Sequence, residues 1–233
     1  MKAFAALCDD LTGSSVQSIL LKDRGIPVRQ VIRPAGETAP PADGGALVVN
    51  CDTRRLPRHE AEAAFRRMLS AIPPDVAVGK RVDTTLRGHV LPETSVILAA
   101  RPLAVALVVP AYPASGRITV GGYHLLNGAL LERTEVARDP IWPIRSSYVP
   151  DYFRDEFSCR LLPMETVKQG SGAVARALSG MISGGARVVV SDAMTEGDLE
   201  SVAEGAASLP SEIIPVDPGP FTAAFVSRKL RTG

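Results

Sequence analysis

Two adjacent carboxylates, Asp9 and Asp10, stand near the N-terminus at the end of a short apolar run. Carboxylates placed in this way suit three tasks: binding hydroxyl groups, taking up a proton, or coordinating a metal ion. A helical pattern opens directly after them, so either carboxylate could instead cap that helix. Thr12 adds a hydroxyl group beside the pair. The local spacing leaves a functional role and a capping role equally open.

A second cluster of charged residues, segment 50–55, also follows an apolar run and contains Arg54 and Arg55. Either guanidinium could bind a carboxylate through two parallel hydrogen bonds. The alternative is a loop of solvated charges that leads into the next helix, and taken alone this segment favours the alternative slightly.

Segment 80–89 mixes several cations with one carboxylate and two hydroxyl groups. This mixture recognises a polyhydroxy acid well, because arginine binds the carboxylate while Asp83 and Thr84 bind hydroxyls. Arg87 is the candidate cation. His89 alone is more typical of a capping or surface histidine than of a catalytic base. A sheet-terminal loop with solvated charges is the alternative for the whole segment.

Two proline-containing segments complete the set. Segment 110–117 ends in Gly116, which permits close backbone approach, and Arg117, which can face an anion. Segment 139–148 holds two prolines and the single tryptophan, Trp142, so it is stiff and suits the wall or lid of a pocket. A rigid structural turn is the alternative for each segment.

The elements that must position these residues alternate along the chain. Apolar runs bounded by Pro or Gly predict strands over 2–7, 28–32, 46–50, 76–80, 103–109, 187–191 and 212–216. Amphipathic patterns predict helices over 15–22, 58–72, about 93–100, 173–182, 196–207 and 221–230. This alternation predicts a three-layer α/β fold, with helices on both faces of a largely parallel sheet.

Segment 110–150 interrupts the alternation and is rich in Gly and Pro. Residues 117–126 and 129–131 are predicted to pair as a small hairpin around Asn127-Gly128, and the rest is predicted to be irregular. A loop is predicted over 33–45. Because the ends of parallel strands share one edge, the loops after them should converge there on a pocket for a small hydroxylated anion.

The bulk composition excludes several classes of protein. Of 233 residues, 45% are hydrophobic and 22% charged, with a net charge of +1, which argues against a nucleic-acid-binding module. No apolar run reaches the length of a membrane span, and the N-terminal one is too short for a signal peptide. Cys8, Cys51 and Cys159 are odd in number and far apart, so neither a disulfide framework nor a zinc site is expected, and the cytoplasm is the expected compartment.

Five motifs, in order and spacing, resemble the N-terminal domain of the four-carbon acid sugar kinases. They are CDDLTG at 8–13, KRVDTTLRG at 80–88, PAYPASGR at 110–117, TVGGYH at 119–124, and segment 135–148 with its ARDP core. The resemblance implies a two-domain kinase. Its N-terminal domain binds threonate, erythronate or 3-oxo-tetronate, and its C-terminal domain binds ATP with Mg²⁺ and phosphorylates a hydroxyl of the acid.

The resemblance and the residue types together assign candidate roles. Asp10 is the catalytic candidate, as the carboxylate that accepts a proton from the acceptor hydroxyl or orients it. The candidates for substrate binding are Asp9, Thr12, Arg54, Asp83, Thr84, Arg87, Gly116 and Arg117. No metal ligand is expected on this chain.

The chain departs from the family in two places. Positions 14–17 hold no acidic residue, where the family usually has one. Residues 1–233 are expected to be the sugar-acid-binding domain alone, without the ATP-binding domain, and no phosphate-binding loop of the GxxxxGK[ST] or GxGxxG type is present.

Three functions remain open on these grounds. The first is the substrate half of a kinase whose ATP-binding half is either a separate chain or missing from this sequence. The second is a catalytically inactive sugar-acid-binding or regulatory module. A metal-dependent hydrolase using Asp9 and Asp10 is weaker, because no histidine cluster supports a metal site. The expected partner is a small acidic sugar, with no nucleic acid or membrane, and a homodimer stays open.

Overall fold

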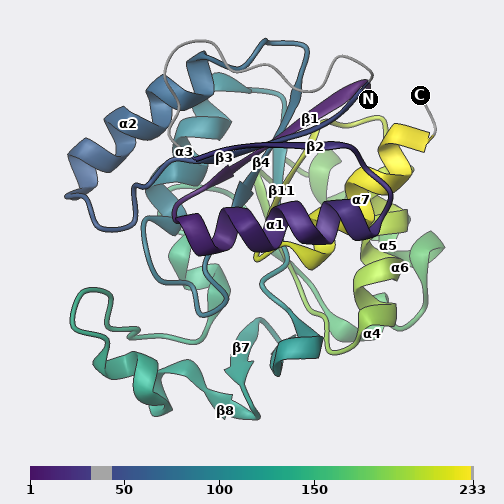
Figure 1. The fold of residues 1–233 in the computed structure, drawn as a ribbon. Coiled ribbons are helices and arrows are strands. Elements are labelled where there is room, and N and C mark those ends of the chain that lie inside the picture. Colours follow the sequence, from purple (N-terminus) through teal and green to yellow (C-terminus); the bar gives the residue numbers. More distant parts are fainter. Residues whose placement is uncertain (33–43, 232–233) are drawn as a thin grey trace.

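A parallel sheet forms the centre of the computed structural model, which describes residues 1–32 and 44–231 (Figure 1). The strands are β1 (Ala3–Cys8), β2 (Val28–Val31), β3 (Gly45–Asn50), β4 (Ala77–Arg81), β5 (Val105–Val108), β9 (Cys159–Leu162), β10 (Val188–Ser191) and β11 (Ile213–Asp217). Their order is β2-β3-β1-β4-β11-β5-β10-β9, and every pair is parallel.

Helices cover both faces of this sheet. One face packs against α1 (Leu11–Asp23), α5 (Ser171–Ser183), α6 (Glu196–Ala207) and α7 (Pro220–Arg231), and α2 (Arg58–Ser70) and α3 (Val90–Ala100) cover the other (Figure 1). Successive strand side chains point to opposite faces, so Phe4 and Ala6 join the first apolar core while Ala5 and Leu7 join the second. The predicted three-layer α/β fold is confirmed.

A small antiparallel sheet is inserted after β5 and lies at the bottom of Figure 1. Its strands are β6 (Arg117–Val120), β7 (Tyr123–Leu126) and β8 (Ala129–Leu130), and short 3-10 helices surround it at Pro113–Ser115, Leu131–Arg133, Glu135–Arg138 and Val149–Tyr152. The prediction of one arm over 117–126 was wrong. Gly121 and Gly122 take positive φ of 58° and 80° and divide that arm into two strands. The turn at Asn127-Gly128 is confirmed.

Other element boundaries differ from the predictions in ways that have local causes. Helix α1 begins at Leu11, four residues early, because the Asp10 side chain accepts the Gly13 amide and starts the helix there. Strand β9 was not predicted, since it is short and lies at the sheet edge, and the four-residue helix α4 (Met164–Val167) follows it. The loop predicted over 33–45 lies mostly outside the described residues. In the described part of the chain, no helix is both long enough and apolar enough to traverse a bilayer.

The chain path places a crevice between β1 and β4. From β1 the chain continues to β2, which lies toward one edge strand of the sheet. From β4 it continues to β5, which lies toward the opposite edge strand. Loops that leave neighbouring parallel strands in opposite directions open a crevice at the carboxyl ends, where ligands of open α/β sheets bind. The first two polar motifs and segment 80–89 all end up at this crevice.

Candidate functional site

A cavity of about 420 Å³ lies at the carboxyl edge of the sheet, and we call it the carboxyl-edge pocket. Its lining comes from the starts of α1 and of the small sheet and from the loops after β3 and β4. The lining residues are Asp10, Thr12, Gly13, Val16, Arg54, Arg81, Asp83, Thr84, Arg87, Tyr112, Ser115 and Arg117. Seven of the nine candidates from the sequence therefore meet in one place. Asp9 and Gly116 lie outside this lining.

Asp9 is buried and bound by Arg54. The Arg54 Nε and Nη2 atoms donate to the two Asp9 carboxylate oxygens at 2.8 and 3.0 Å. Burial alone would raise the pKa of Asp9, but Lys80, Arg54 and Arg81 together hold it below the usual value. The bidentate carboxylate contact expected of Arg54 thus exists, but its partner is within the protein.

Asp10 does both of the things that its sequence position suggested. One oxygen, Oδ1, accepts the Gly13 amide at 2.7 Å and so caps α1, and it also lies 3.3 Å from Arg81 Nη1. The other oxygen lies 2.8 Å from Arg54 Nη1. The side chain is still 25% exposed, against 2% for Asp9, so Asp10 is the member of the pair that a ligand can reach.

Gly13 is required by this arrangement. A Cβ atom at that position would stand 2.0 Å from Arg81 Nη1, because the guanidinium packs directly over the first turn of α1. Arg81 is 5% exposed, and its place beside Asp10 depends on the missing side chain.

Asp83 organises the loop after β4. Its carboxylate accepts from Arg87 at 2.8 and 3.0 Å and from the Thr85 hydroxyl and amide at 2.6 and 3.1 Å. Burial would raise the pKa of Asp83, but the bonds from Arg87 and the charge of Arg54 hold it well below its usual range. Arg87 also reaches Asp139 at 3.1 Å, so Asp139 ties the loop to segment 139–148.

Arg117 differs from the other three arginines of the pocket. Arg54, Arg81 and Arg87 each have a carboxylate within ion-pair distance. Within the described ranges Arg117 has none: its Nη1 donates to the Ser115 carbonyl, and its buried Nε has no hydrogen-bond partner. The pocket therefore contains one guanidinium whose charge is not balanced by an acidic side chain.

Gly116 serves the turn that delivers Arg117. It has a φ of +75°, and a Cβ atom there would stand 2.1 Å from the side-chain oxygen of Asn127. The close approach is to the protein's own turn at Asn127, since the pocket lining does not include Gly116.

A buried ion pair lies behind the pocket lining, in the core of the protein. Lys80 Nζ lies 2.5 Å from Glu93 Oε2, with both residues at most 1% exposed, and it donates to the Arg81 carbonyl at 2.8 Å. Thr53 donates its hydroxyl to the other Glu93 oxygen. Side chains of consecutive strand residues point to opposite faces, so Lys80 turns into the core while Arg81 faces α1.

Segment 139–148 lies beside the loops that carry the site but contributes no residue to the lining of the carboxyl-edge pocket. The Trp142 indole donates to the Arg54 carbonyl at 2.9 Å, and its ring meets His89 edge-on at 4.6 Å. His89 Nε2 lies 2.9 Å from the Leu56 carbonyl, which agrees with a structural role for this histidine.

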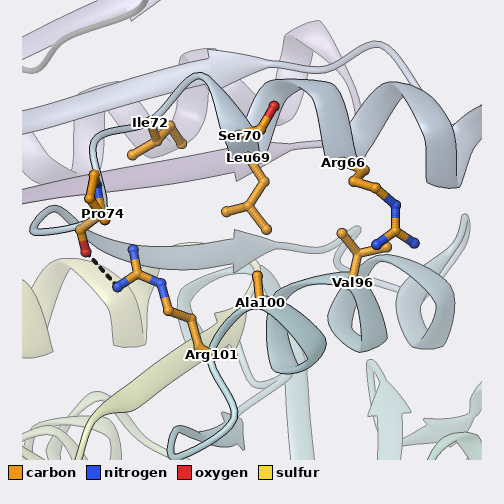
Figure 2. A pocket seen from close by; sticks show the side chains of 8 residues that line it. All are labelled: Arg66, Leu69, Ser70, Ile72, Pro74, Val96, Ala100 and Arg101. Atoms are coloured by element: carbon orange, nitrogen blue, oxygen red, sulfur yellow. Dashed lines mark hydrogen bonds between the residues drawn. The ribbon is translucent and has the colours of Figure 1, made fainter.

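A second cavity of about 350 Å³ lies between α2 and α3, and we call it the amino-edge cavity because the chain enters β4 beside it (Figure 2). Its floor is apolar, with Leu69, Ile72 and Val96, and two arginines stand at its rim. Arg101 donates to the carbonyls of Pro74 and Val76 at 2.7 and 3.1 Å. This cavity lacks the carboxylates and the convergent loops of the carboxyl-edge pocket.

Sequence reasoning missed several lining residues, although they stand within the motifs that it singled out. Arg81 adjoins Lys80, and strand alternation could have separated the buried cation from the one that faces α1. Tyr112 and Ser115 precede Gly116 and Arg117 in segment 110–117. Nothing in the sequence shows that Arg54 would meet three carboxylates, Asp9, Asp10 and Asp83.

The described residues of the pocket do not fit a Mg²⁺ ion. Asp10 and Asp83 both face guanidinium groups, which occupy the positions that a cation would need. Across the described ranges, no three or more His, Cys, Asp or Glu residues are grouped so as to hold a metal ion.

Comparison with known sequences places this geometry among related proteins. The family described as the sugar-binding N-terminal domain matches residues 4–225. The D-erythronate kinase of Heliobacterium modesticaldum is 38% identical in an alignment 247 positions long, which covers 100% of this chain and 55% of that protein. The D-threonate kinase of Salmonella typhimurium is 30% identical over 210 residues, covering 88% and 49% respectively. The chain thus spans about half the length of these relatives.

A solved structure has the same fold. A domain of unknown function from Bordetella bronchiseptica, a domain-swapped dimer with bound citrate, superposes with a TM-score of 0.79 at 26% identity. The similarity covers 97% of this chain and 55% of the other.

Proposed function

Because the chain belongs to the sugar-binding N-terminal domain family of the four-carbon acid sugar kinases, we propose that its pocket binds a four-carbon sugar acid and presents one hydroxyl of that acid for phosphorylation. The observation that carries the proposal is the composition of the carboxyl-edge pocket. One guanidinium without an acidic partner faces the same space as two carboxylates and two threonines.

These groups orient the acid. The carboxylate of the ligand binds Arg117, because this is the pocket cation whose charge is unbalanced, and an arginine binds a carboxylate through two parallel hydrogen bonds. The carbon chain then extends toward Asp10, Thr12 and Thr84, whose oxygens suit hydroxyl groups.

Asp10 holds the acceptor hydroxyl in this proposal, as the exposed member of the aspartate pair. Phosphoryl transfer depends mostly on positioning and on stabilisation of charge, so a fixed carboxylate that orients the hydroxyl is a sufficient contribution from this side. Arg54 and Arg81 keep that carboxylate in place from two directions.

ATP and Mg²⁺ are supplied from outside this pocket in the proposal, by an ATP-binding half on the same or a separate chain. The relatives are about twice as long as this chain, which leaves room for such a half in them. We expect the protein to act in the cytoplasm. The domain-swapped dimer formed by the Bordetella bronchiseptica protein supports a homodimer, which light scattering would measure.

One observation favours a second candidate, a sugar-acid-binding module without catalysis. Both oxygens of Asp10 already have partners, namely the Gly13 amide and Arg81 on one side and Arg54 on the other. A carboxylate whose two oxygens are held in this way suits the binding and orienting of a ligand hydroxyl, which needs no catalytic step.

Calorimetry tests the shared part of both candidates. The chain is titrated with D-erythronate, D-threonate and the uncharged tetritol erythritol. We expect heat of binding with at least one acid and none with erythritol, because Arg117 needs an anion. No heat with either acid at millimolar concentration contradicts the proposal. Phosphorylation of the bound acid after an ATP-binding half is added separates the kinase from the module.

A further inference from the structure

His124 is a fully buried histidine on β7 that does not line the pocket and yet contacts a residue that does. Its Nε2 lies 3.0 Å from the carbonyl oxygen of Thr84, and its Nδ1 lies 3.0 Å from the hydroxyl of Thr119. The imidazole therefore joins β6 and β7, through Thr119 and His124, to the loop after β4. The TVGGYH motif at 119–124, which contains it, has no other part in the proposed function.

The hydrogen-bond partners define the tautomer of His124. A carbonyl oxygen only accepts, so Nε2 carries the hydrogen and donates it to Thr84. Nδ1 then accepts the hydroxyl hydrogen of Thr119. Burial lowers the pKa of His124 to about 4, so the ring is neutral near pH 7, as this pattern requires.

Thr84 stands in the middle of the loop that supplies Asp83, Thr84 and Arg87 to the pocket. At its start the loop is tied to the sheet, because the Val82 amide donates to the Asp217 carbonyl at 3.0 Å, and Arg87 ties it to segment 139–148. Within the loop the Leu86 amide donates to the Asp83 carbonyl at 3.0 Å, and Leu86 takes a φ of +62°. A non-glycine residue at positive φ is strained, so such a loop needs support from outside to hold one conformation.

The small sheet that carries His124 is itself anchored to the main sheet. Asp192, which follows β10, accepts the amides of Gly121 and Gly122 at 2.7 and 2.8 Å. Thr119 and Ala193 exchange two backbone hydrogen bonds, at 2.9 and 3.0 Å. The end of β10 is thereby connected, through β6 and β7, to the loop after β4.

We propose that His124 is a positioning residue of the carboxyl-edge pocket: by donating to the Thr84 carbonyl, it holds Asp83, Thr84 and Arg87 in the arrangement that receives the sugar acid. This inference rests on the proposed function for the identity of the ligand. It goes beyond it by assigning a ligand-binding effect to a side chain outside the pocket.

Two substitutions separate the two nitrogens of the ring. In His124→Gln the amide NH₂ reaches about as far as Nε2 and keeps a donor for Thr84, whereas in His124→Asn it reaches only about as far as Nδ1. Calorimetry with D-erythronate and D-threonate should give about tenfold weaker binding for His124→Asn, and His124→Gln should restore affinity to within about threefold of the wild type.

A stability control and a ligand-free measurement accompany the titrations. Val189→Ala in β10 removes buried volume away from the pocket and should leave affinity within about twofold while lowering the melting temperature. Hydrogen exchange of residues 83–88 should be faster in His124→Asn than in the wild type or in Val189→Ala.

Defined outcomes overturn the inference. The inference is overturned if His124→Asn has the same affinity for the acid as the wild type and the same hydrogen exchange at 83–88. It is also overturned if Val189→Ala weakens the binding of the acid as much as His124→Asn does. Should His124→Asn fail to fold, Thr119→Val tests the contact indirectly, because it removes the hydroxyl that donates to Nδ1 and so supports the tautomer in which Nε2 donates to Thr84. An affinity about threefold lower then supports the inference, and wild-type affinity overturns it. If the wild type binds neither acid, the proposed function fails, while the exchange comparison still tests the role of His124.

Discussion

The carboxyl-edge pocket and the amino-edge cavity are similar in size, at about 420 and 350 Å³, and both contain arginine. They differ in what their arginines are bound to. In the amino-edge cavity Arg101 donates to two backbone carbonyls and lies 3.6 Å from Glu212, so it connects α3 to the chain before β4 (Figure 2). In the carboxyl-edge pocket Arg117 has no acidic partner among the described residues. Arg66 at the amino-edge cavity has no acidic partner among the described residues either, but it is exposed, whereas Arg117 is partly buried. A partly buried, unbalanced charge at converging loops therefore distinguishes the carboxyl-edge pocket, and cavity size does not.

The carboxyl edge also differs in having a fully buried ion pair, Lys80 and Glu93, close to it. Breaking this pair is expected to have the largest effect on stability. Glu93→Gln removes the carboxylate that pairs directly with the buried Lys80 and should lower the free energy of unfolding by about 3 to 5 kcal/mol in urea titrations. The control Glu62→Gln breaks the partly exposed pair with Arg58 and should cost about 0.5 kcal/mol or less. Equal stability of Glu93→Gln and the wild type would show that the pair is unimportant.

His124 predicts a pH dependence specific to this edge. Its pKa is about 4 in the folded protein, against 6.5 for an ordinary histidine, and the charged groups that face it are Arg117 and Asp83. Because the unfolded chain binds a proton that the folded protein excludes, this contribution is full above pH 6.5 and is lost as pH falls toward 4. It amounts to about 3 kcal/mol at most.

Urea unfolding of the wild type and His124→Gln between pH 4.5 and 7.5 checks this dependence. The stability of the wild type should fall more steeply on acidification than that of His124→Gln. The exposed His59 serves as the control, and His59→Gln should follow the wild type. Parallel curves for the wild type and His124→Gln would rule out a histidine that is neutral in the folded state.

Matched arginine substitutions compare the two cavities directly. Arg117→Met should weaken the binding of D-erythronate or D-threonate at least about thirtyfold, because the carboxylate of the acid loses a charge-assisted pair worth about 2 kcal/mol. Arg66→Met at the amino-edge cavity should leave affinity within about twofold. Calorimetry measures both. The reverse pattern would place the ligand between α2 and α3.

The smallest effect is expected for Arg101→Met. It removes two hydrogen bonds to backbone carbonyls and a partly exposed ion pair with Glu212. It should lower the free energy of unfolding by about 1 to 2 kcal/mol, without changing the affinity for the acid. Thermal melts check the loss of stability, and calorimetry on the same preparation checks the unchanged affinity. A loss of affinity would show that the two edges of the sheet are coupled.

Much of the site could be predicted because its residues follow strand ends. Asp9-Asp10 after β1 and Asp83 after β4 meet because neighbouring parallel strands end at one edge, and the alternation of strands and helices had already indicated a parallel sheet. The division of β6 from β7 could not be predicted, because the turn at Gly121-Gly122 depends on Asp192, 70 or more residues away.

The sequence by itself determined the sheet, its helices and the kinds of side chain at its carboxyl edge, since local periodicity and strand direction are enough for these. Only the tertiary structure decided which charges neutralise one another. Arg54 and Asp9 are 45 residues apart, and Arg81 and Asp10 are 71 apart, so their pairing depends on which strand ends are neighbours. Among the described residues that line the pocket, the same pairing leaves Arg117 as the cation without a carboxylate partner. In our proposal this cation binds the carboxylate of the acid.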